Sequence, residues 1–228
     1  MNPPIATPSS PARRWLCCTL LAALTAAAHA GGSGDIVERH TTRTTLRGTI
    51  VVTDIGDTIK ITHVNIGQAR GILNPLAIFD GIVRWRPVPG MAELYQDWAQ
   101  QGAEFIYLSS EPESHERRMR EELEKNGFPA GRIYLNGYGG TAIASQKISM
   151  AIDLFERHPR ARFVFVGDSG ERDPEIFGEL ARTYPQLRRI YIRRTTDDTD
   201  LRYTRAFRRL PQSQWWVFRE PDELGRLP

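Results

Sequence analysis

The sequence predicts an α/β domain in which a five-stranded, mainly parallel sheet lies between two layers of helices. Short apolar runs rich in β-branched residues alternate along the chain with longer amphipathic segments, and this alternation is typical of βαβ units. Polar residues directly follow several of the apolar runs. We expect such residues at the carboxyl edge of a parallel sheet, where ligands bind.

Five apolar runs are predicted to be strands, and glycine or proline marks the ends of most helices between them. The strands are expected at 49–54, 104–108, 132–135, 162–166 and 189–192. The helices are expected at 91–101, 112–126, 145–158 and 174–183, with Gly102 and Gly127 closing the first two. With right-handed crossovers, these units make a Rossmann-like three-layer sandwich.

Two segments depart from this alternation. Residues 59–88 are rich in glycine and proline and carry Trp85 between two arginines, and we interpret them as a small cap insertion over the site. The tail from residue 195 contains the apolar run Trp215–Phe218, which fits one more strand at the sheet edge. For its tryptophans, packing is favoured over contact with lipid.

The first 30 residues have the pattern of a secretory signal peptide. An apolar run follows Arg13 and Arg14, and Ala28-His29-Ala30 matches a small-x-small cleavage site. The run is short for a bilayer span, although an uncleaved anchor is the alternative. We therefore expect export to the periplasm or out of the cell, with residues 31–228 as the single mature domain.

Composition and charge exclude several classes of protein. Hydrophobic residues make up 40% of the chain and charged residues 25%, which argues against disorder. Both cysteines, Cys17 and Cys18, lie in the predicted signal peptide, so the mature chain has no disulfide and no thiolate zinc site. The peptide also holds two of the 30 basic residues and none of the 27 acidic ones. The remaining net charge of about +1 gives no electrostatic case for nucleic-acid binding.

Four polar residues occur in an order that suits phosphate chemistry. Asp54 ends the first strand and could serve as nucleophile and metal ligand, and Asp168 ends the fourth. Two carboxylates with few other protein ligands suit Mg²⁺, which keeps several waters and binds phosphate. Ser109 and Lys147 could donate to phosphate oxygens. Each residue alone has an ordinary alternative: a cap or turn for the aspartates, a cap of the next helix for Ser109, and a solvated side chain for Lys147. Their occurrence in this order favours the site.

These residues also follow the order of four known motifs: Asp54 with Thr58, then Ser109, then Lys147, then Asp168 with Asp173. The chain resembles the haloacid dehalogenase superfamily in this order, and within it the catalytic domain of phosphatidate phosphatases of the actin-patch-protein type. The resemblance covers most of residues 48–194 and is carried by Val52–Lys60, Val88–Tyr95, Tyr107–Pro112, Asn126–Gly131 and Val166–Glu175.

The resemblance implies a Mg²⁺-dependent phosphomonoester hydrolase that forms an aspartyl-phosphate on Asp54. Ser109 and Lys147 would hold the phosphoryl oxygens. The metal would be held by Asp54, Asp168, Asp173 and the backbone carbonyl of Gly56. The family substrate is phosphatidate, which yields diacylglycerol, so the resemblance implies a role in lipid metabolism.

Gly56 departs from the family pattern, which has a second aspartate two residues after the nucleophile. In the family that aspartate is the general acid and base, and glycine cannot transfer a proton. The loss of a positioned acid–base group typically costs about 10²–10⁴-fold in rate. Asp57 is not expected to replace it, because adjacent side chains on extended backbone point apart. Asp80 of the insertion is an alternative donor.

Three functions are compatible with this sequence. The first is an exported phosphatase, slow or specialised, acting on phosphatidate or a smaller phosphoester. The alternative is a catalytically dead pseudophosphatase that binds a phosphate headgroup or a partner protein, and the third is a scaffold without ligand. The expected partner is a phosphorylated small molecule or a phospholipid headgroup. Arginine clusters in helix 112–126 and in the tail suit peripheral membrane contact, although such clusters are more commonly solvated.

Overall fold

The computed structural model describes residue 46 and residues 48–62, 85–135 and 143–227. The predicted signal peptide at 1–30 lies outside these residues, as do Asp80 and most of the predicted cap insertion. All of the described residues belong to one unit of the chain, Ile36–Pro228.

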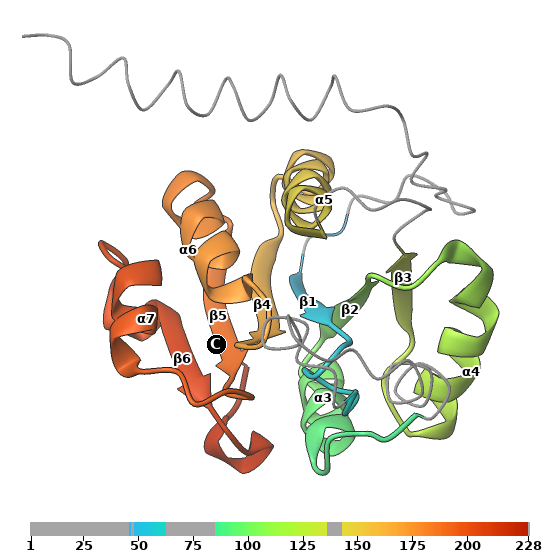
Figure 1. Cartoon of the computed structure of the whole chain (residues 1–228). Coiled ribbons are helices and arrows are strands. Elements are labelled where there is room, and N and C mark those ends of the chain that lie inside the picture. Colours follow the sequence, from blue (N-terminus) through green and yellow to red (C-terminus); the bar gives the residue numbers. More distant parts are fainter. Residues whose placement is uncertain (1–45, 47, 63–84, 136–142, 228) are drawn as a thin grey trace, which may run out of the picture. The chain divides into compact units, whose positions relative to one another are not determined.

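A six-stranded sheet runs through this unit, and every neighbouring pair of strands is parallel (Figure 1). The strands are β1 (Thr49–Asp54), β2 (Ala103–Ser109), β3 (Gly131–Leu135), β4 (Arg162–Asp168), β5 (Leu187–Arg193) and β6 (Trp215–Phe218). The predicted α/β class is confirmed, but five strands was one too few. The sixth strand is the apolar run in the tail that was expected at the sheet edge.

The strand order β3-β2-β1-β4-β5-β6 places β1 near the middle of the sheet. The chain moves outwards from β1 through β2 to β3, and then returns to the other side of β1 with β4. The topological switch point therefore lies between β1 and β4. In open parallel sheets, ligands bind at the carboxyl ends of the strands at such a point.

Helices cover both faces of the sheet, as expected for a three-layer sandwich. One face carries α5 (Ile143–Arg157), α6 (Asp173–Thr183) and α7 (Asp200–Ala206), and the other carries α3 (Met91–Gln100) and α4 (Glu116–Lys125) (Figure 1). α7 was not predicted from the sequence, because seven residues are too few to show a clear helical period. Three 3₁₀ turns complete the elements: η2 (Glu113–His115), η3 (Gln212–Gln214) and η4 (Pro221–Glu223).

Alternating strand residues form two separate cores. In β1, Ile50 and Val52 pack in the core that includes Leu154 of α5, whereas Val51 packs in the core that includes Trp98 of α3. All six residues of β1 are buried, which explains why this strand is rich in β-branched residues rather than alternating with polar ones. A strand fixed on both faces gives its last residue a defined position.

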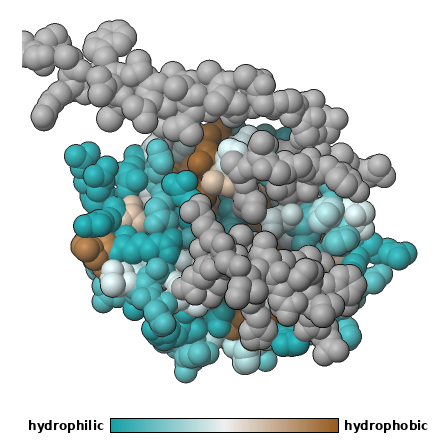
Figure 2. All heavy atoms as spheres, viewed as in Figure 1, coloured by the Kyte–Doolittle hydropathy of each residue, from teal (hydrophilic) through white to brown (hydrophobic). Residues whose placement is uncertain are grey.

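The visible surface of the described residues is mostly hydrophilic (Figure 2). Among the described residues, the exposed large hydrophobic side chains are Leu201 and Trp216. Trp215 stacks on Phe207, and the Arg189 guanidinium lies 4.5 Å from the Trp216 ring centroid. Within the part of the chain that the structure describes, no helix has the length and apolar character needed to cross a bilayer.

The described ends of the predicted cap insertion meet beside β1. Lys60 and Pro87 form an antiparallel bridge, the Ile61 N–H donates to the Arg86 carbonyl at 2.7 Å, and the Val88 N–H donates to the Ile59 carbonyl at 2.8 Å. Residues 59–61 and 86–88 therefore lie side by side, next to the turn that follows Asp54.

We predict that Gly178→Ala destabilises the domain by about 1–3 kcal/mol, as is typical of overpacking. A Cβ at position 178 of α6 would overlap the Ala206 carbonyl oxygen of α7, so the two helices would have to separate. Urea unfolding measures the change. Gly225→Ala is the control, since a Cβ there meets nothing within 4 Å. Equal stability of Gly178→Ala and the parent would show that α7 is not packed this closely.

Candidate active site

Asp54 is the last residue of β1 and stands at the middle of the carboxyl edge of the sheet. β1 pairs with β2 on one side and with β4 on the other. The Asp54 side chain is buried, and its Oδ2 accepts a long hydrogen bond of 3.5 Å from the Thr58 hydroxyl in the following turn. The predicted nucleophile is therefore held by a rigid strand at the switch point.

Asp168 and Asp173 meet Asp54 at this edge. Asp168 ends β4 and Asp173 begins α6, and both side chains are buried. One carboxylate oxygen from each of the three aspartates lies within 4.8 Å of the others. The predicted metal-binding carboxylates are thus brought together in space, although more than 110 residues separate Asp54 from Asp168 in the sequence.

Gly167 makes room for Asp173. A Cβ at position 167 would overlap the Asp173 carboxylate, and the Asp168 N–H donates to Asp173 Oδ2 at 3.3 Å. The glycine before Asp168 therefore allows the start of α6 to pack directly against the end of β4. The packing role of Gly167 was not predicted from the sequence.

Lys147 of α5 lies among these carboxylates and is buried with them. Its Nζ is 3.0 Å from Asp54 Oδ1, 2.7 Å from Asp173 Oδ1 and 2.9 Å from Glu171 Oε2. Lys147 was predicted to bind phosphate, and the alternative of a solvated lysine is wrong. Glu171 was missed as a site residue, although it stands in the same stretch as Asp168 and Asp173.

The charges in this cluster are out of balance. Burial and repulsion between neighbouring carboxylates raise the pKa of all three aspartates, and that of Asp168 reaches about 8. The positive charge of Lys147 acts in the opposite direction and lowers these pKa values. Burial alone would lower the pKa of Lys147, but Asp173, Asp54 and Glu171 outweigh it and raise that pKa. The lysine therefore stays charged, and one positive charge faces four acidic side chains.

The donor set fits a divalent cation that prefers oxygen ligands. Asp168 Oδ2 is a buried carboxylate oxygen without a hydrogen-bond partner among the described residues, which is costly unless a cation or another donor reaches it. Three carboxylates close together and an excess of negative charge match the ligands that hard cations bind. The Gly56 carbonyl accepts the Thr58 N–H at 2.6 Å, so one of its two lone pairs is already used.

Ser109 ends β2, directly beside β1. Its Oγ accepts a hydrogen bond from the Glu111 N–H at 3.1 Å. This bond lies in the turn before η2, whose N-cap is Pro112 without a side-chain cap, so the alternative that Ser109 caps the next helix is wrong. The hydroxyl proton remains available as a donor, because accepting a bond uses only a lone pair. This hydrogen bond and phosphate binding by Ser109 are thus compatible.

The turn after Asp54 differs from the extended backbone that the sequence analysis assumed. Asp57 has a φ of 49°, in the left-handed region, and its carboxylate accepts bonds from the Thr62 N–H at 2.9 Å and the Thr62 hydroxyl at 2.5 Å. Asp57 is therefore engaged elsewhere. A Cβ at Gly56 would lie 3.7 Å from Asp54 Oδ2, an ordinary contact, so the backbone here does not require glycine.

Arg202 of α7 holds the loop that joins β4 to α6. Its guanidinium donates to the Ser169 carbonyl at 2.5 Å and the Glu171 carbonyl at 2.6 Å, and it pairs with Glu175 and Asp198. Hydrogen bonding to Glu175 leads the interactions that raise the pKa of Arg202. Arg202 was missed from the sequence, because nothing in the sequence indicated that α7 would reach this loop.

The fold and the site together define a Rossmann-like α/β domain with a buried acidic centre of the metal-binding kind at its switch point. Residues 49–194 match the model of a family described as the catalytic domain of phosphatidate phosphatase APP1, and the chain belongs to this family. The resemblance predicted from the sequence is thereby confirmed.

Two curated proteins and one solved structure are similar to the chain. Phosphatidate phosphatase APP1 of Saccharomyces cerevisiae is 33% identical over 153 residues, which are 63% of this chain and 25% of that protein. An uncharacterized protein of Schizosaccharomyces pombe is 23% identical over 163 residues, 66% of this chain and 26% of that protein. The chain thus spans about a quarter of the length of these curated relatives. A solved structure from Thermotoga maritima, described as a β-phosphoglucomutase, aligns with a TM-score of 0.43 and 13% identity over 77% of this chain and 95% of that one.

We predict that, with a chelator present, the free energy of unfolding of the parent falls between pH 5 and pH 8. In the Asp168→Asn variant it should fall by less over the same range. Burial and Asp173 raise the pKa of Asp168 from 3.8 to about 8, so the folded state binds this proton more tightly than the unfolded state. The resulting stability is complete below about pH 4 and is lost as the pH rises towards 8. Urea unfolding at both pH values should give a difference between the two proteins of at least about 1 kcal/mol. Equal pH dependence would contradict a raised pKa at Asp168.

Proposed function

We propose that this domain is a Mg²⁺-dependent phosphomonoester hydrolase of the phosphatidate phosphatase type, with a weakened proton-transfer step. The observation that carries the proposal is the meeting of Asp54, Asp168 and Asp173 with Lys147 at the switch point. Family membership supports the same reaction class and makes phosphatidate the first substrate to test. The predicted signal peptide would place this activity outside the cytoplasm.

Asp54 would carry the chemistry in two steps. An Asp54 oxygen attacks phosphorus, the new carboxylate–phosphorus bond forms, and the bond to the leaving oxygen breaks with its electron pair on that oxygen. Water then attacks the phosphorus of the aspartyl-phosphate, releasing inorganic phosphate and restoring the carboxylate. Lys147 and the Ser109 hydroxyl would hold the phosphoryl oxygens during both steps.

Asp54, Asp168, Asp173 and the Gly56 carbonyl would hold the metal. When bound, Mg²⁺ would offset the charge on the phosphoryl oxygens and on the carboxylates around it. Asp168 Oδ2, which has no hydrogen-bond partner among the described residues, supports this assignment. Arg202 would keep the loop between Asp168 and Asp173 in position by holding its backbone carbonyls.

Gly56 limits the reaction because it supplies no proton to the leaving oxygen. A leaving group that is already a weak base needs less protonation, so an aryl phosphate should react faster than an alkyl phosphate. Water also lacks a general base at this position, which would prolong the life of the aspartyl-phosphate. If this second effect dominates, the protein acts as a pseudophosphatase that binds phosphate esters without useful turnover.

We predict that Gly56→Asp raises kcat by about 10²–10⁴-fold with phosphatidate, the usual contribution of a positioned general acid and base. The Cβ of the new side chain would meet only ordinary contacts, with Asp54 Oδ2 at 3.7 Å. Mg²⁺-dependent phosphate release from phosphatidate and from an aryl phosphate should be measured for the parent, Gly56→Asp and Asp54→Asn. Asp54→Asn should release no phosphate from either substrate.

The three proteins separate the candidate functions. Release by the parent that is lost in Asp54→Asn identifies an enzyme, whereas release by Gly56→Asp alone identifies a pseudophosphatase on an intact catalytic framework. Absence of release from all three proteins would contradict the proposed function, provided that circular dichroism shows them folded.

We predict that Mg²⁺ raises the melting temperature of the parent and that this increase is lost in Asp173→Asn. Binding to the folded state alone stabilises a protein by about 2.7 kcal/mol at a ligand concentration of 100 times Kd. Differential scanning fluorimetry at pH 8 with and without Mg²⁺ makes the comparison. The exposed Asp97→Asn variant is the control and should keep the full increase. An equal increase in all three proteins would place the metal elsewhere.

A further inference from the structure

A second buried ion pair lies outside the acidic cluster. The Lys60 side chain is 3% exposed, and its Nζ donates to Glu111 Oε1 at 3.0 Å. The Trp85 ring lies over this ammonium group, with its centroid 5.5 Å from Nζ. Neither Lys60 nor Glu111 has a role in the reaction proposed above. Because burying such a pair adds little to stability, what the pair can supply is a fixed geometry.

Lys60 belongs to the turn that follows Asp54. Its N–H donates to the Ile55 carbonyl at 3.0 Å, and its carbonyl accepts a bond from the Asp57 N–H at 2.8 Å. Lys60 also forms a bridge with Gly56. The backbone of Lys60 is thus joined to the segment that begins directly after the proposed nucleophile.

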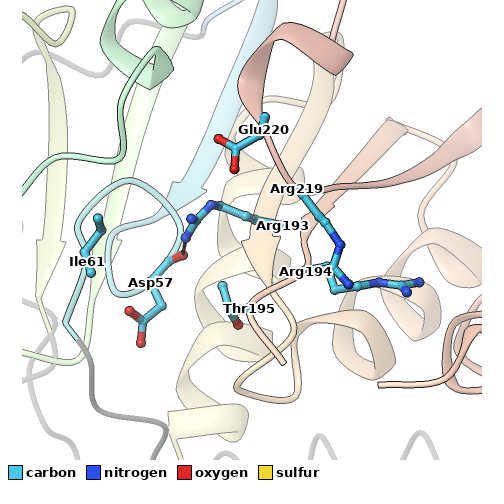
Figure 3. Close-up of a pocket in the computed structure, with 7 residues that line it drawn as sticks. All are labelled: Asp57, Ile61, Arg193, Arg194, Thr195, Arg219 and Glu220. Atoms are coloured by element: carbon cyan, nitrogen blue, oxygen red, sulfur yellow. Dashed lines mark hydrogen bonds between the residues drawn. The ribbon is translucent and has the colours of Figure 1, made fainter. Parts of the chain in front are cut away.

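The same turn is also held by β5, which lies on the other side of β1 from β2. In Figure 3 the Arg193 side chain extends to the turn, where its Nη1 donates to the Asp57 carbonyl at 2.8 Å. This contact and the backbone bonds of the turn hold it independently of Glu111. The turn can therefore serve as the anchor of the ion pair, and the loop after β2 is the part that the pair holds in place.

Glu111 stands in that loop and contacts Ser109. Asp54 and Leu108 are register partners, and the Ile55 N–H donates to the Leu108 carbonyl at 3.0 Å, so Ser109 is the first residue of β2 past this bond. The Glu111 N–H donates to Ser109 Oγ at 3.1 Å, which engages one lone pair of the hydroxyl and restricts its rotation. The direction in which Ser109 donates its proton therefore depends on the position of Glu111.

The carboxylate of Glu111 is held at both oxygens. Its Oε1 accepts the bond from Lys60, and its Oε2 lies 3.0 Å from His115 Nδ1 in η2. His115 follows Glu111 in the same segment, so that contact stays within the loop. The contact with Lys60, in contrast, joins the loop to the turn after Asp54.

We propose that Lys60 and Glu111 are positioning residues, which set the place of the Ser109 hydroxyl relative to Asp54 so that it donates to a phosphoryl oxygen. The inference rests on the proposed function and extends it to two residues that contact neither the substrate nor the metal. Without the pair, the domain would keep its fold but Ser109 would lose its fixed direction. The contribution of the Ser109 hydroxyl to phosphoryl binding would then be lost.

Binding of methylphosphonate, an unreactive phosphoryl anion, tests the inference on the full chain with Mg²⁺. A ³¹P NMR titration gives the Kd for the parent, Ser109→Ala, Lys60→Met and the Lys60→Met/Ser109→Ala double variant. In the parent, Ser109→Ala should raise the Kd by about tenfold or more, the usual effect of losing a hydrogen bond to a charged group. In the Lys60→Met background, the same change should raise the Kd by less than about threefold, because the two residues act together.

Lys125→Met is the matched control, since Lys125 is exposed in α4 and the substitution is the same. In this background Ser109→Ala should keep its full effect. Each comparison is made within one background, so a general change of charge near the site cancels. If circular dichroism shows that Lys60→Met does not fold, Lys60→Met/Glu111→Leu takes its place, because apolar residues commonly replace a buried ion pair without loss of stability.

The outcomes separate this inference from the proposed function. A full effect of Ser109→Ala in the absence of Lys60 would overturn the positioning role, whatever the change in stability. An unchanged Kd on Ser109→Ala in the parent would also overturn it and would leave the metal centre as proposed. If methylphosphonate does not bind to the parent with Mg²⁺, the proposed function fails and the inference is overturned with it.

Discussion

The site depends on one buried lysine that holds carboxylates from separate parts of the chain together. Lys147 comes from α5, whereas its partners Asp54 and Asp173 come from β1 and α6. Removing such charges from water costs free energy that their attraction only partly returns. The cluster is therefore not expected to add much to the stability of the fold. It indicates a functional site instead, because acidic groups with shifted pKa values are common where a protein binds or transforms a ligand.

Two glycines at this edge differ in whether packing requires them. Gly167 is required by packing, since any side chain there would overlap Asp173. Gly56 is not required by packing, because a Cβ would meet only ordinary contacts and its backbone is not in the left-handed region. A side chain at position 56 would therefore alter the chemistry of the site without a clash at its Cβ.

Much of the fold could be predicted because the signals are local. The β-branched run of β1 and the glycines after α3 and α4 mark elements within a few residues of themselves. The motif order likewise indicated Asp54, Lys147 and Asp168. Arg202 and Arg193 could not be predicted, since their contacts with Glu171 and Asp57 join segments 31 and 136 residues apart. Only the packing of α7 and β5 against the site brings those residues into reach.

The central place of β1 also shapes how the chain must fold. Thr49 lies beside Ala103 on one side and beside Arg162 on the other, so the strand that carries Asp54 gains its second neighbour only late in the sequence. Pairing over such long loops is entropically costly and slow. Until β4 emerges during synthesis, β1 has an open apolar edge that other strands can join. The arrangement that buries Asp54 in the finished domain therefore leaves the unfinished chain prone to aggregation until β4 has been made.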